Sequence, residues 1–388
     1  MNSLLKTGAE KEPNKTIRII IASTIEEKIE IYRLRYLIYV EEMSRRLELI
    51  DHETKLLYDE MDDWGILIYA QIGIEIIGTM RVNVGKLDDF PRELVQILSL
   101  DKFQKFDTRQ NFALSTKLMV SPNYRSSQAL YLLLAKGYEI YCNHQVQFSF
   151  GGCNFFLIRL YEQLGFHRFG RNFIDPGYGL LTPIVLLVDG IDHLRAVRSP
   201  YLRIARKRES FNSQVVNWFS REFPDCLTVV NSQLFNEEML WAYLCSRLES
   251  LPQKSIPVAN VLSEEEARKL FHCGVVVQCH AGDQIITCGD TSNELNILIS
   301  GTLTTNGSPN RSANTINHGQ HFGTIGLYDQ SKYTEDAIAT TQSEIFVLSR
   351  QSFQKFSHNN PDTANKFLQH LTTFVDDNKH QGGEPNEQ

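Results

Sequence analysis

The chain has 388 residues, of which 42% are hydrophobic and 22% charged, and its formal net charge at pH 7 is −7. This length predicts two domains, and this composition is typical of folded globular protein rather than of a disordered chain. Because the net charge is negative and the 39 basic residues are spread along the chain, we expect no nucleic-acid partner.

Cysteine and histidine usage indicates the compartment. The seven cysteines form no C-x-x-C motif, and the eleven histidines form no H-E-x-x-H motif. Free thiols in a reducing environment are the simplest explanation, so we expect no disulfide and no metal site. The sequence starts with a polar stretch and contains no apolar run of membrane-spanning length, which predicts a cytoplasmic protein with no transmembrane segment.

The residue composition and the hydrophobic pattern change along the chain and predict five parts. These are a disordered tail at 1–15, an α+β domain at 16–205, a helical connector at 206–257, an all-β domain at 258–375 and a second disordered tail at 376–388.

In the α+β domain, alternating and helical hydrophobic patterns follow one another. In chain order they predict a strand at 17–22, a helix at 25–42, a hairpin of strands at 64–72 and 74–84, a strand at 114–120, a helix at 128–143, a strand at 146–150, a helix at 154–164 that ends at Gly165, and strands at 166–169 and 183–188. This order predicts a mixed sheet flanked by helices on both faces. The absence of G-x-G-x-x-G argues against a doubly wound sheet.

Three segments in order, LMVSPNYRSSQALYLLLAKGYEIY, VQFSF and LYEQLGFHRFG, resemble the GNAT acyltransferase superfamily. The resemblance implies that the first segment is a strand, turn and helix that binds the pyrophosphate of the acyl donor's pantetheine arm. The donor would be bound by Val120, Arg125, Ser126, Ser127 and Gln128. A helix N-terminus with an adjacent arginine favours an anionic phosphate, although an ordinary capped helix would explain the two serines equally well.

The turn Arg125-Ser126-Ser127-Gln128 lacks glycine. Within the superfamily this resembles the branch that makes N-acyl-homoserine lactones and N-acyl amino acids, often from acyl groups on acyl carrier protein. Y-R-L-R-Y-L-I-Y at 32–39, D-E-M-D at 59–62 and G-T-M-R at 78–81 resemble motifs of that branch. They imply that Arg35, Asp59, Asp62 and Arg81 surround the amine and carboxylate of the substrate. Taken singly, each could equally be a solvated or turn-capping charge.

One strand departs from that branch. Where homoserine-lactone synthases carry E-S-x-R, this chain has Leu114-Ser115-Thr116-Lys117. The missing carboxylate makes homoserine lactone an unexpected acceptor, and Lys117 keeps the charge of the arginine without its bidentate geometry. The resemblance further implies a backbone amide around 148–152 that stabilises the oxyanion and a thiolate-protonating tyrosine, Tyr161. Phe148, Phe150, Phe155 and Phe156 are more simply explained as core than as an acyl tunnel.

Residues 262–356 resemble a cyclic-nucleotide-binding domain, through G-D-Q-I-I at 282–286, L-N-I-L-I-S-G-T-L at 295–303 and H-F-G-T-I-G-L at 321–327. The resemblance implies a jelly roll with flanking helices. Thr324 stands where nucleotide-binding members have a glutamate for the ribose, and Glu335 where they have an arginine for the phosphate. A carboxylate there repels a phosphate, so cyclic AMP is not expected, although Lys332 leaves another ligand open.

Together these features predict an N-acyltransferase that moves an acyl group, fatty in the simplest case, from acyl carrier protein or a CoA thioester to a small primary amine such as an amino acid. We expect no tightly bound cofactor, with acyl-ACP or acyl-CoA as co-substrate. The jelly roll would regulate the enzyme or form a homodimer, and an amphiphilic product would be released at a membrane surface. Lys102, Lys105, Arg125, Arg168 and Arg171 are candidates for a surface that meets the acidic carrier. The alternatives are a non-catalytic thioester-binding scaffold and a nucleotide-regulated protein lysine acyltransferase.

Overall fold

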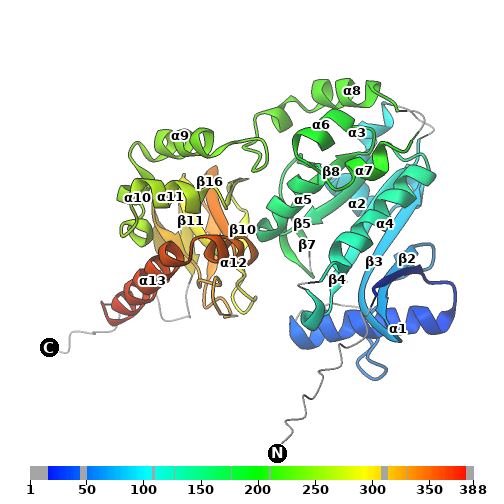
Figure 1. The fold of residues 1–388 in the computed structure, drawn as a ribbon, viewed down its shortest axis with the longest axis horizontal. Coiled ribbons are helices and arrows are strands. Elements are labelled where there is room, and N and C mark those ends of the chain that lie inside the picture. Colours follow the sequence, from blue (N-terminus) through cyan, green and yellow to red (C-terminus); the bar gives the residue numbers. More distant parts are fainter. Residues whose placement is uncertain are drawn as a thin grey trace, which may run out of the picture.

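The structure is a computed structural model that describes residues 16–43, 50–106, 110–125, 127–175, 177–208, 211–306, 313–329 and 331–381. It has the two-part architecture that the sequence predicts, a mixed sheet with helices followed by an antiparallel β domain with helices (Figure 1). The N-terminal tail, 1–15, lies outside the described residues. Part of the tail expected at 376–388 belongs to the last helix, which continues to Gln381, and residues 382–388 lie outside the described residues.

The first domain is built on an eight-stranded sheet with the order β1-β2-β3-β4-β5-β8-β6, in which β7 also pairs with β8. Its strands are β1 (Arg18–Ile21), β2 (Ile66–Ile72), β3 (Glu75–Gly85), β4 (Phe112–Val120), β5 (Phe148–Cys153), β6 (Phe166–Arg168), β7 (Phe173–Asp175) and β8 (Gly179–Leu187). The pair β4–β5 is parallel and the other pairs are antiparallel. Strand β7 was not predicted, because three residues are too few to show a hydrophobic period.

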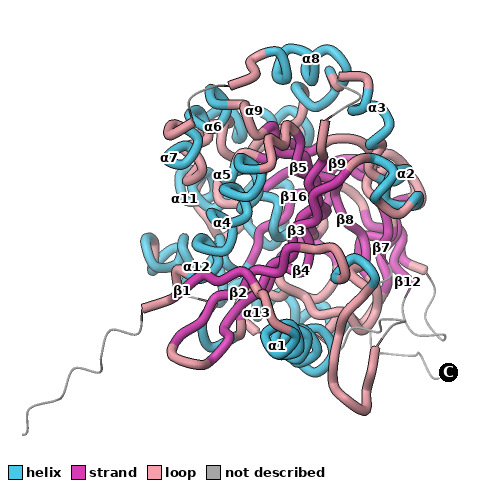
Figure 2. The backbone as a smooth tube through the Cα atoms, turned by 90° about the vertical axis from the view of Figure 1, so that its right-hand side faces the viewer, coloured by secondary structure: helices cyan, strands magenta, loops and turns pink. Residues whose placement is uncertain are grey.

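Helices cover both faces of this sheet, as the sequence predicts. They are α1 (Ile25–Tyr36), which continues as the π-helix η1 (Leu37–Glu42), the short 3₁₀ turns η2 (Glu60–Asp62), η3 (Leu87–Asp89), η4 (Pro122–Tyr124) and η5 (Phe155–Leu157), and the helices α2 (Arg92–Ile97), α3 (Leu100–Gln104), α4 (Ala129–Asn143), α5 (Ile158–Leu164), α6 (Ile191–Ala196) and α7 (Leu202–Ala205). In Figure 2, α4 to α7 lie on one side of the strands and α2 and α3 on the other.

Two apolar clusters fill the space between helices and sheet. Leu133 and Tyr138 of α4 pack with Val82 of the sheet on one face. Phe103 of α3 packs with Phe148 and Phe150 of β5 on the other face, together with the connector helix α8 (Gln214–Glu222). The alternation of side chains along each strand places Ala113 in the first cluster and its neighbours Phe112 and Leu114 in the second.

The connector continues through η6 (Pro224–Leu227), α9 (Glu237–Leu248), α10 (Pro252–Ser255) and η7 (Pro257–Ala259) to the second domain. That domain consists of two four-stranded antiparallel sheets, β10-β15-β12-β13 and β14-β11-β16-β9. Its elements are α11 (Glu264–Phe271), β9 (Val275–Cys279), β10 (Gln284–Ile286), β11 (Glu294–Ser300), β12 (Leu303–Asn306), β13 (Asn314–Ile316), β14 (His321–Phe322), β15 (Asp336–Ala339), β16 (Ser343–Ser349), α12 (Arg350–Asn359) and α13 (Pro361–Gln381).

The two domains share an interface rich in hydrogen bonds. Arg159 and Arg168 of the first domain donate to main-chain carbonyls of the second, at 2.9 Å to His272 O and 2.7 Å to Val276 O. Asn172 bonds Gln278 O at 2.9 Å and the Asp283 carboxylate at 3.0 Å. Arg168 is therefore buried in this interface and does not belong to a surface that could meet a carrier protein.

Across the described part of the chain, we find no helix with both the length and the apolar character needed to cross a bilayer. The same residues contain no group of three or more His, Cys, Asp or Glu side chains that could hold a metal ion.

Candidate active site

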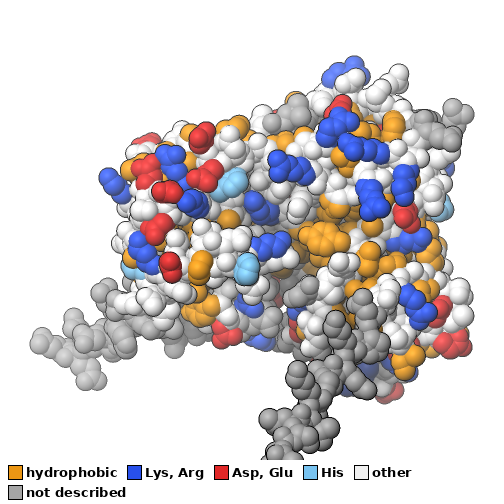
Figure 3. All heavy atoms as spheres, viewed as in Figure 1, with side chains coloured by type: hydrophobic (Ala, Val, Ile, Leu, Met, Phe, Trp, Pro, Cys, Tyr) orange, Lys and Arg blue, Asp and Glu red, His pale blue; other side chains and the backbone are white. Residues whose placement is uncertain are grey.

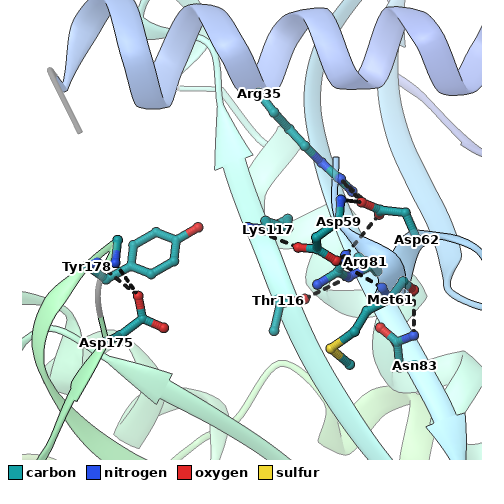
Figure 4. A network of polar contacts seen from close by, with 11 residues as sticks. Arg35, Asp59, Met61, Asp62, Arg81, Asn83, Thr116, Lys117, Asp175 and Tyr178 are labelled. Carbon is teal, nitrogen blue, oxygen red and sulfur yellow. Dashed lines mark hydrogen bonds and ion pairs between the residues drawn. The ribbon is translucent and has the colours of Figure 1, made fainter. Parts of the chain in front are cut away.

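A cluster of charged side chains lies between α1 and the sheet, where the sequence pattern predicts the substrate to bind (Figure 4). Arg35 comes from the last turn of α1, Asp59 and Asp62 from the loop before β2, and Arg81 from β3. The four residues are far apart in the sequence, and the structure brings all of them together.

The loop that holds the two carboxylates is closed by a reciprocal capping interaction. The Asp59 side chain accepts from Met61 N at 3.1 Å, and the Asp62 side chain accepts from Asp59 N at 3.0 Å. The Asn83 side chain donates to Met61 O at 2.8 Å and ties this loop to β3. The D-x-x-D spacing is therefore a capping box, which turns both carboxylates toward the same arginines.

The inner part of the cluster is buried and paired. One nitrogen of Arg35 lies 2.8 and 2.9 Å from the two oxygens of Asp62, and these side chains are 0% and 1% exposed. Arg81, which is 2% exposed, pairs with Asp59 and lies 3.0 Å from Asp62, and its Nε donates to Thr116 Oγ1 at 3.0 Å. Arg35, Asp62 and Arg81 thus hold one another, and Asp59, at 26% exposed, is the carboxylate that reaches the open side of the cluster.

The charges of the cluster change the affinity of its members for protons. Burial alone would raise the pKa of Asp59, but Arg81, Lys117 and Arg35 outweigh it, and the pKa of this carboxyl lies below its ordinary value. Burial would lower the pKa of Arg81, and the charges of Asp62 and Asp59 instead raise it. Asp59 is consequently a stable carboxylate, suited to holding a cation.

Lys117 is a fifth member of the cluster that the sequence did not single out as a site residue. Its Nζ lies 3.4 Å from Asp59 Oδ2 and 5.6 and 5.7 Å from the ring centroids of Tyr39 and Tyr178. The residue has a φ of +54° at an irregularity in the β3–β4 pairing, where the register shifts between Thr79 and Arg81. The sequence signal for Lys117 was its position in the stretch that corresponds to E-S-x-R. The irregularity in the β3–β4 pairing that orients its side chain appears only in the structure.

The sheet opens beside Lys117. The parallel pairing of β4 and β5 ends at Leu114 and Phe150, and beyond this point β5 continues in register with β8, Gly151 opposite Ile184. An ideal Cβ on Gly151 would lie 3.6 Å from Ser115 O, an ordinary van der Waals contact with β4. The main chain of β5 after Phe150 is where the sequence predicts the amide that stabilises an oxyanion, and that assignment stays a prediction.

Tyr161, predicted to protonate the leaving thiolate, lies on α5 in the apolar core, with its ring centroid 5.3 Å from that of Phe166. Burial raises the pKa of Tyr161, as does the proximity of Cys153, Tyr141 and Tyr39. Its proposed role in proton transfer remains a prediction.

The predicted donor turn follows β4 and leads into α4. Arg125 forms an ion pair with Glu42 of the π-helix at 2.7 Å, and its Nε donates to Val120 O at 3.2 Å. Ser127 Oγ accepts from Ala129 N at 3.2 Å and Gln128 O accepts from Leu132 N at 3.0 Å, which leaves Leu130 and Tyr131 as the amides in the first turn of α4 that have no acceptor inside the helix. Ser126, the remaining predicted donor contact, lies outside the described residues.

Basic side chains gather on the surface over α6 and α7 (Figure 3). Arg198, Arg203, Arg206 and Lys207 are all exposed there. Tyr201, between these residues, stacks on Tyr138 of α4 with centroids 4.5 Å apart, so the basic surface adjoins the C-terminal half of α4, and the donor turn is at the other end of this helix. The sequence predicted the basic surface from other residues, because the short helices that bring these four together were not recognised.

In the second domain, the segment between Gly323 and Ala337 corresponds in position to the nucleotide site of cyclic-nucleotide-binding domains. Tyr333 of this segment is buried, and its hydroxyl donates to Glu294 Oε1 at 2.6 Å. An ideal Cβ on Gly323 would lie 2.4 Å from Ile286 and 3.0 Å from the Tyr333 ring, so the ring packs closely against this turn. Burial raises the pKa of Glu294.

We therefore expect cyclic AMP at millimolar concentration to leave the melting temperature of the protein unchanged. A ligand at 100 times its Kd would stabilise the folded state by about 2.7 kcal/mol, which a thermal-shift assay detects. The physical reason is that Tyr333 and Glu294 occupy the interior of the roll and Glu335 adds a second carboxylate. A saturable rise with cyclic AMP that AMP does not produce would contradict this expectation.

The comparisons with known proteins bear on both domains. Residues 30–188 match the family model described as "N-acyl amino acid synthase FeeM", and residues 276–360 match the model described as "Cyclic nucleotide-binding domain". No curated protein matches the chain.

Solved structures similar to the chain fall into the same two groups. FeeM, an N-acyl amino acid synthase from uncultured soil microbes, is 12% identical, and the match covers 50% of this chain and 99% of FeeM with a TM-score of 0.38. A cyclic nucleotide-binding domain from Methylobacillus flagellatus KT is 22% identical over 36% of this chain and 80% of that one, with a TM-score of 0.31. The N-terminal domain of a transcriptional regulator from Streptomyces coelicolor A3(2) is 18% identical over 34% and 94%, with a TM-score of 0.29.

The family-model matches confirm the resemblances on which the sequence argument rests. The chain thus joins an acyltransferase domain similar to N-acyl amino acid synthase FeeM, at residues 30–188, to a domain of the cyclic-nucleotide-binding type, at residues 276–360.

Proposed function

We propose that the protein transfers an acyl group, fatty in the simplest case, from the thioester of acyl carrier protein or CoA to the primary amine of a small acceptor such as an amino acid. The observation that supports this proposal best is the partly exposed carboxylate Asp59, held by Arg81 beside the point where β4 and β5 separate. A carboxylate that stays ionised in a partly closed site can bind and orient an ammonium group.

The reaction needs few groups. The neutral amine attacks the thioester carbonyl and an N–C bond forms. The nitrogen loses a proton, the C–S bond breaks, and the thiolate takes up a proton, so that the products are an amide and a thiol. The main chain of β5 beyond Phe150 is the proposed oxyanion donor, and Asp59 positions the amine. Arg35, Asp62 and Arg81 act in this proposal as positioning residues, because they are buried against one another.

The donor is proposed to bind at the turn after β4, where Arg125 and the first amides of α4 offer partners for a phosphate. The exposed basic side chains over α6 and α7 fit an acidic carrier protein. A test of the proposal therefore compares acyl carrier protein and CoA as carriers of the same acyl group. We propose no tightly bound cofactor and no nucleic-acid partner.

The decisive experiment incubates the purified full-length protein with each acyl thioester and pooled amino acids, and follows thiol release together with the masses of new N-acyl products. We expect Asp59→Ala to lower kcat/KM by about tenfold to a hundredfold, the range for losing a charge-assisted contact. The matched control is Asp192→Ala, because Asp192 is 95% exposed and pairs only with a neighbour on its own helix. Equal activity of Asp59→Ala and wild type would contradict the proposed site.

One observation favours a second function. Leu114, which stands where homoserine-lactone synthases carry a carboxylate, is 4% exposed in an apolar cluster and supplies no base. A protein that binds an acyl thioester without turning it over would tolerate this change. Tight thioester binding with no new product and no thiol release would support this scaffold and contradict the enzyme.

A further inference from the structure

Lys117 is the cation of the cluster that takes no part in the buried ion pairs around Asp62 and that shares Asp59 with Arg81. The cluster contains three cationic side chains, Arg35, Arg81 and Lys117, and two carboxylates, Asp59 and Asp62. One positive charge is therefore in excess. Asp62 is shared by both arginines and Asp59 is shared by Arg81 and Lys117, so Lys117 has only a shared carboxylate to balance its charge.

The surroundings of Lys117 disfavour an unpaired charge. Its side chain is 13% exposed and lies over the rings of Tyr39 and Tyr178, with Asp59 as its one carboxylate partner among the described residues. Burial lowers the pKa of Lys117, and the charges of Arg81 and Arg35 lower it further against the opposing effect of Asp59. An additional carboxylate at this position would complete the charge balance of the cluster.

The two groups that face the open side have opposite charges and are adjacent. Lys117 Nζ and Asp59 Oδ2 are 3.4 Å apart. An α-amino acid carries its ammonium and its carboxylate on the same carbon, so one molecule can present its ammonium to Asp59 and its carboxylate to Lys117. A simple amine matches only the first of these contacts.

We propose that Lys117 is the specificity-determining residue of the site and binds the α-carboxylate of the acceptor, so that amino acids are acylated in preference to amines that lack this group. This inference rests on the proposed function and adds to it the residue that recognises the acceptor. The position of Lys117, three residues beyond the last β4–β5 pair, would place the acceptor beside the opening of the sheet.

The test compares leucine with leucinamide as acceptors for the full-length protein. We expect the wild type to use leucine with a KM roughly tenfold or more below that for leucinamide, the effect of one charge-assisted contact. Lys117→Met should raise KM for leucine to that for leucinamide with little change in KM for leucinamide. Lys117→Arg should retain most of the preference, since it keeps the charge.

The control variant is Lys136→Met, because Lys136 is a lysine on α4 whose carboxylate partner is Glu139, one turn away on the same helix. It should keep the wild-type preference, and melting temperatures of all variants show whether each is folded. A wild type that acylates both acceptors with the same KM, or a folded Lys117→Met that still prefers leucine, would overturn the inference while leaving the acyltransferase intact. A wild type that acylates neither acceptor, nor any pooled amino acid, would instead overturn the proposed function.

The pH dependence gives an independent readout. The groups that face Lys117 are Asp59, Arg81 and Arg35, with the phenol rings of Tyr39 and Tyr178. Because Lys117 binds a carboxylate only when it is protonated, KM for leucine should rise as the pH increases through its lowered pKa. In Lys117→Arg the guanidinium stays protonated. The ratio of KM for leucine of the wild type to KM for leucine of Lys117→Arg should therefore increase with pH. A ratio that is constant with pH would contradict the role of Lys117.

Discussion

Replacing Asp62 by alanine is expected to lower the free energy of unfolding by about 3–5 kcal/mol, the usual cost of removing one partner of a buried ion pair. Asp62 is 1% exposed and interacts with Arg35 and Arg81, which are 0% and 2% exposed. Without this carboxylate, the Arg35 guanidinium remains buried and loses the ion pair that the described residues give it. The free energy is measured by urea unfolding, followed in the far ultraviolet.

The chain offers an exposed ion pair as a control for this experiment. Glu30 and Arg33 are both 54% exposed on the outer face of α1, and such pairs are worth about 0–1 kcal/mol. Glu30→Ala should therefore change stability little. The double variant Arg35→Met with Asp62→Leu should recover much of the loss, because a buried pair can be replaced by apolar side chains of similar volume. An Asp62→Ala variant as stable as Glu30→Ala would show that the cluster does not stabilise the fold.

The second large effect is expected at the interface between the domains. Arg168 is buried, lies 2.8 Å from Glu162 and donates to the carbonyls of Val230 and Val276. Arg168→Met removes these contacts together and leaves Glu162 buried with the amide of Ser232, at 2.8 Å, as its remaining partner. We expect a loss of about 3–5 kcal/mol and the separation of one cooperative melting transition into two in calorimetry.

The matched control is Arg171→Met, three residues further along the chain, because Arg171 is exposed. It should melt as the wild type does. If Arg168→Met kept a single transition at the wild-type temperature, the hydrogen bonds between the domains would not be what makes them unfold together.

Most of the first domain follows from local patterns. The capping box at Thr24 starts α1 at Ile25, as predicted, and Gly73, with a φ of +61°, makes the tight hairpin between β2 and β3. Gly165, with a φ of +105°, ends α5. These signals act within a few residues of the chain, so they can be read without knowledge of the fold.

The elements that were missed are those without a local signal. Helices α2 and α3 have six and five residues, and β7 and α7 are shorter still. Segments of this length are fixed by the apolar cluster into which they pack, in which Leu100 and Phe103 contribute to the core of the sheet's second face. That information lies in contacts with distant residues.

For the candidate site, motifs alone identified Arg35, Asp59, Asp62 and Arg81, and the structure brings these four side chains together. Which of them is buried and which can reach a ligand follows from the packing of distant elements. Whether a charge is available to a ligand depends on its burial and on which partner has already neutralised it, and both are set by elements up to tens of residues away. For this reason Arg35 and Asp62 appear as a buried pair, whereas Lys117, aimed by an irregularity in β4, is the cation that faces the open side.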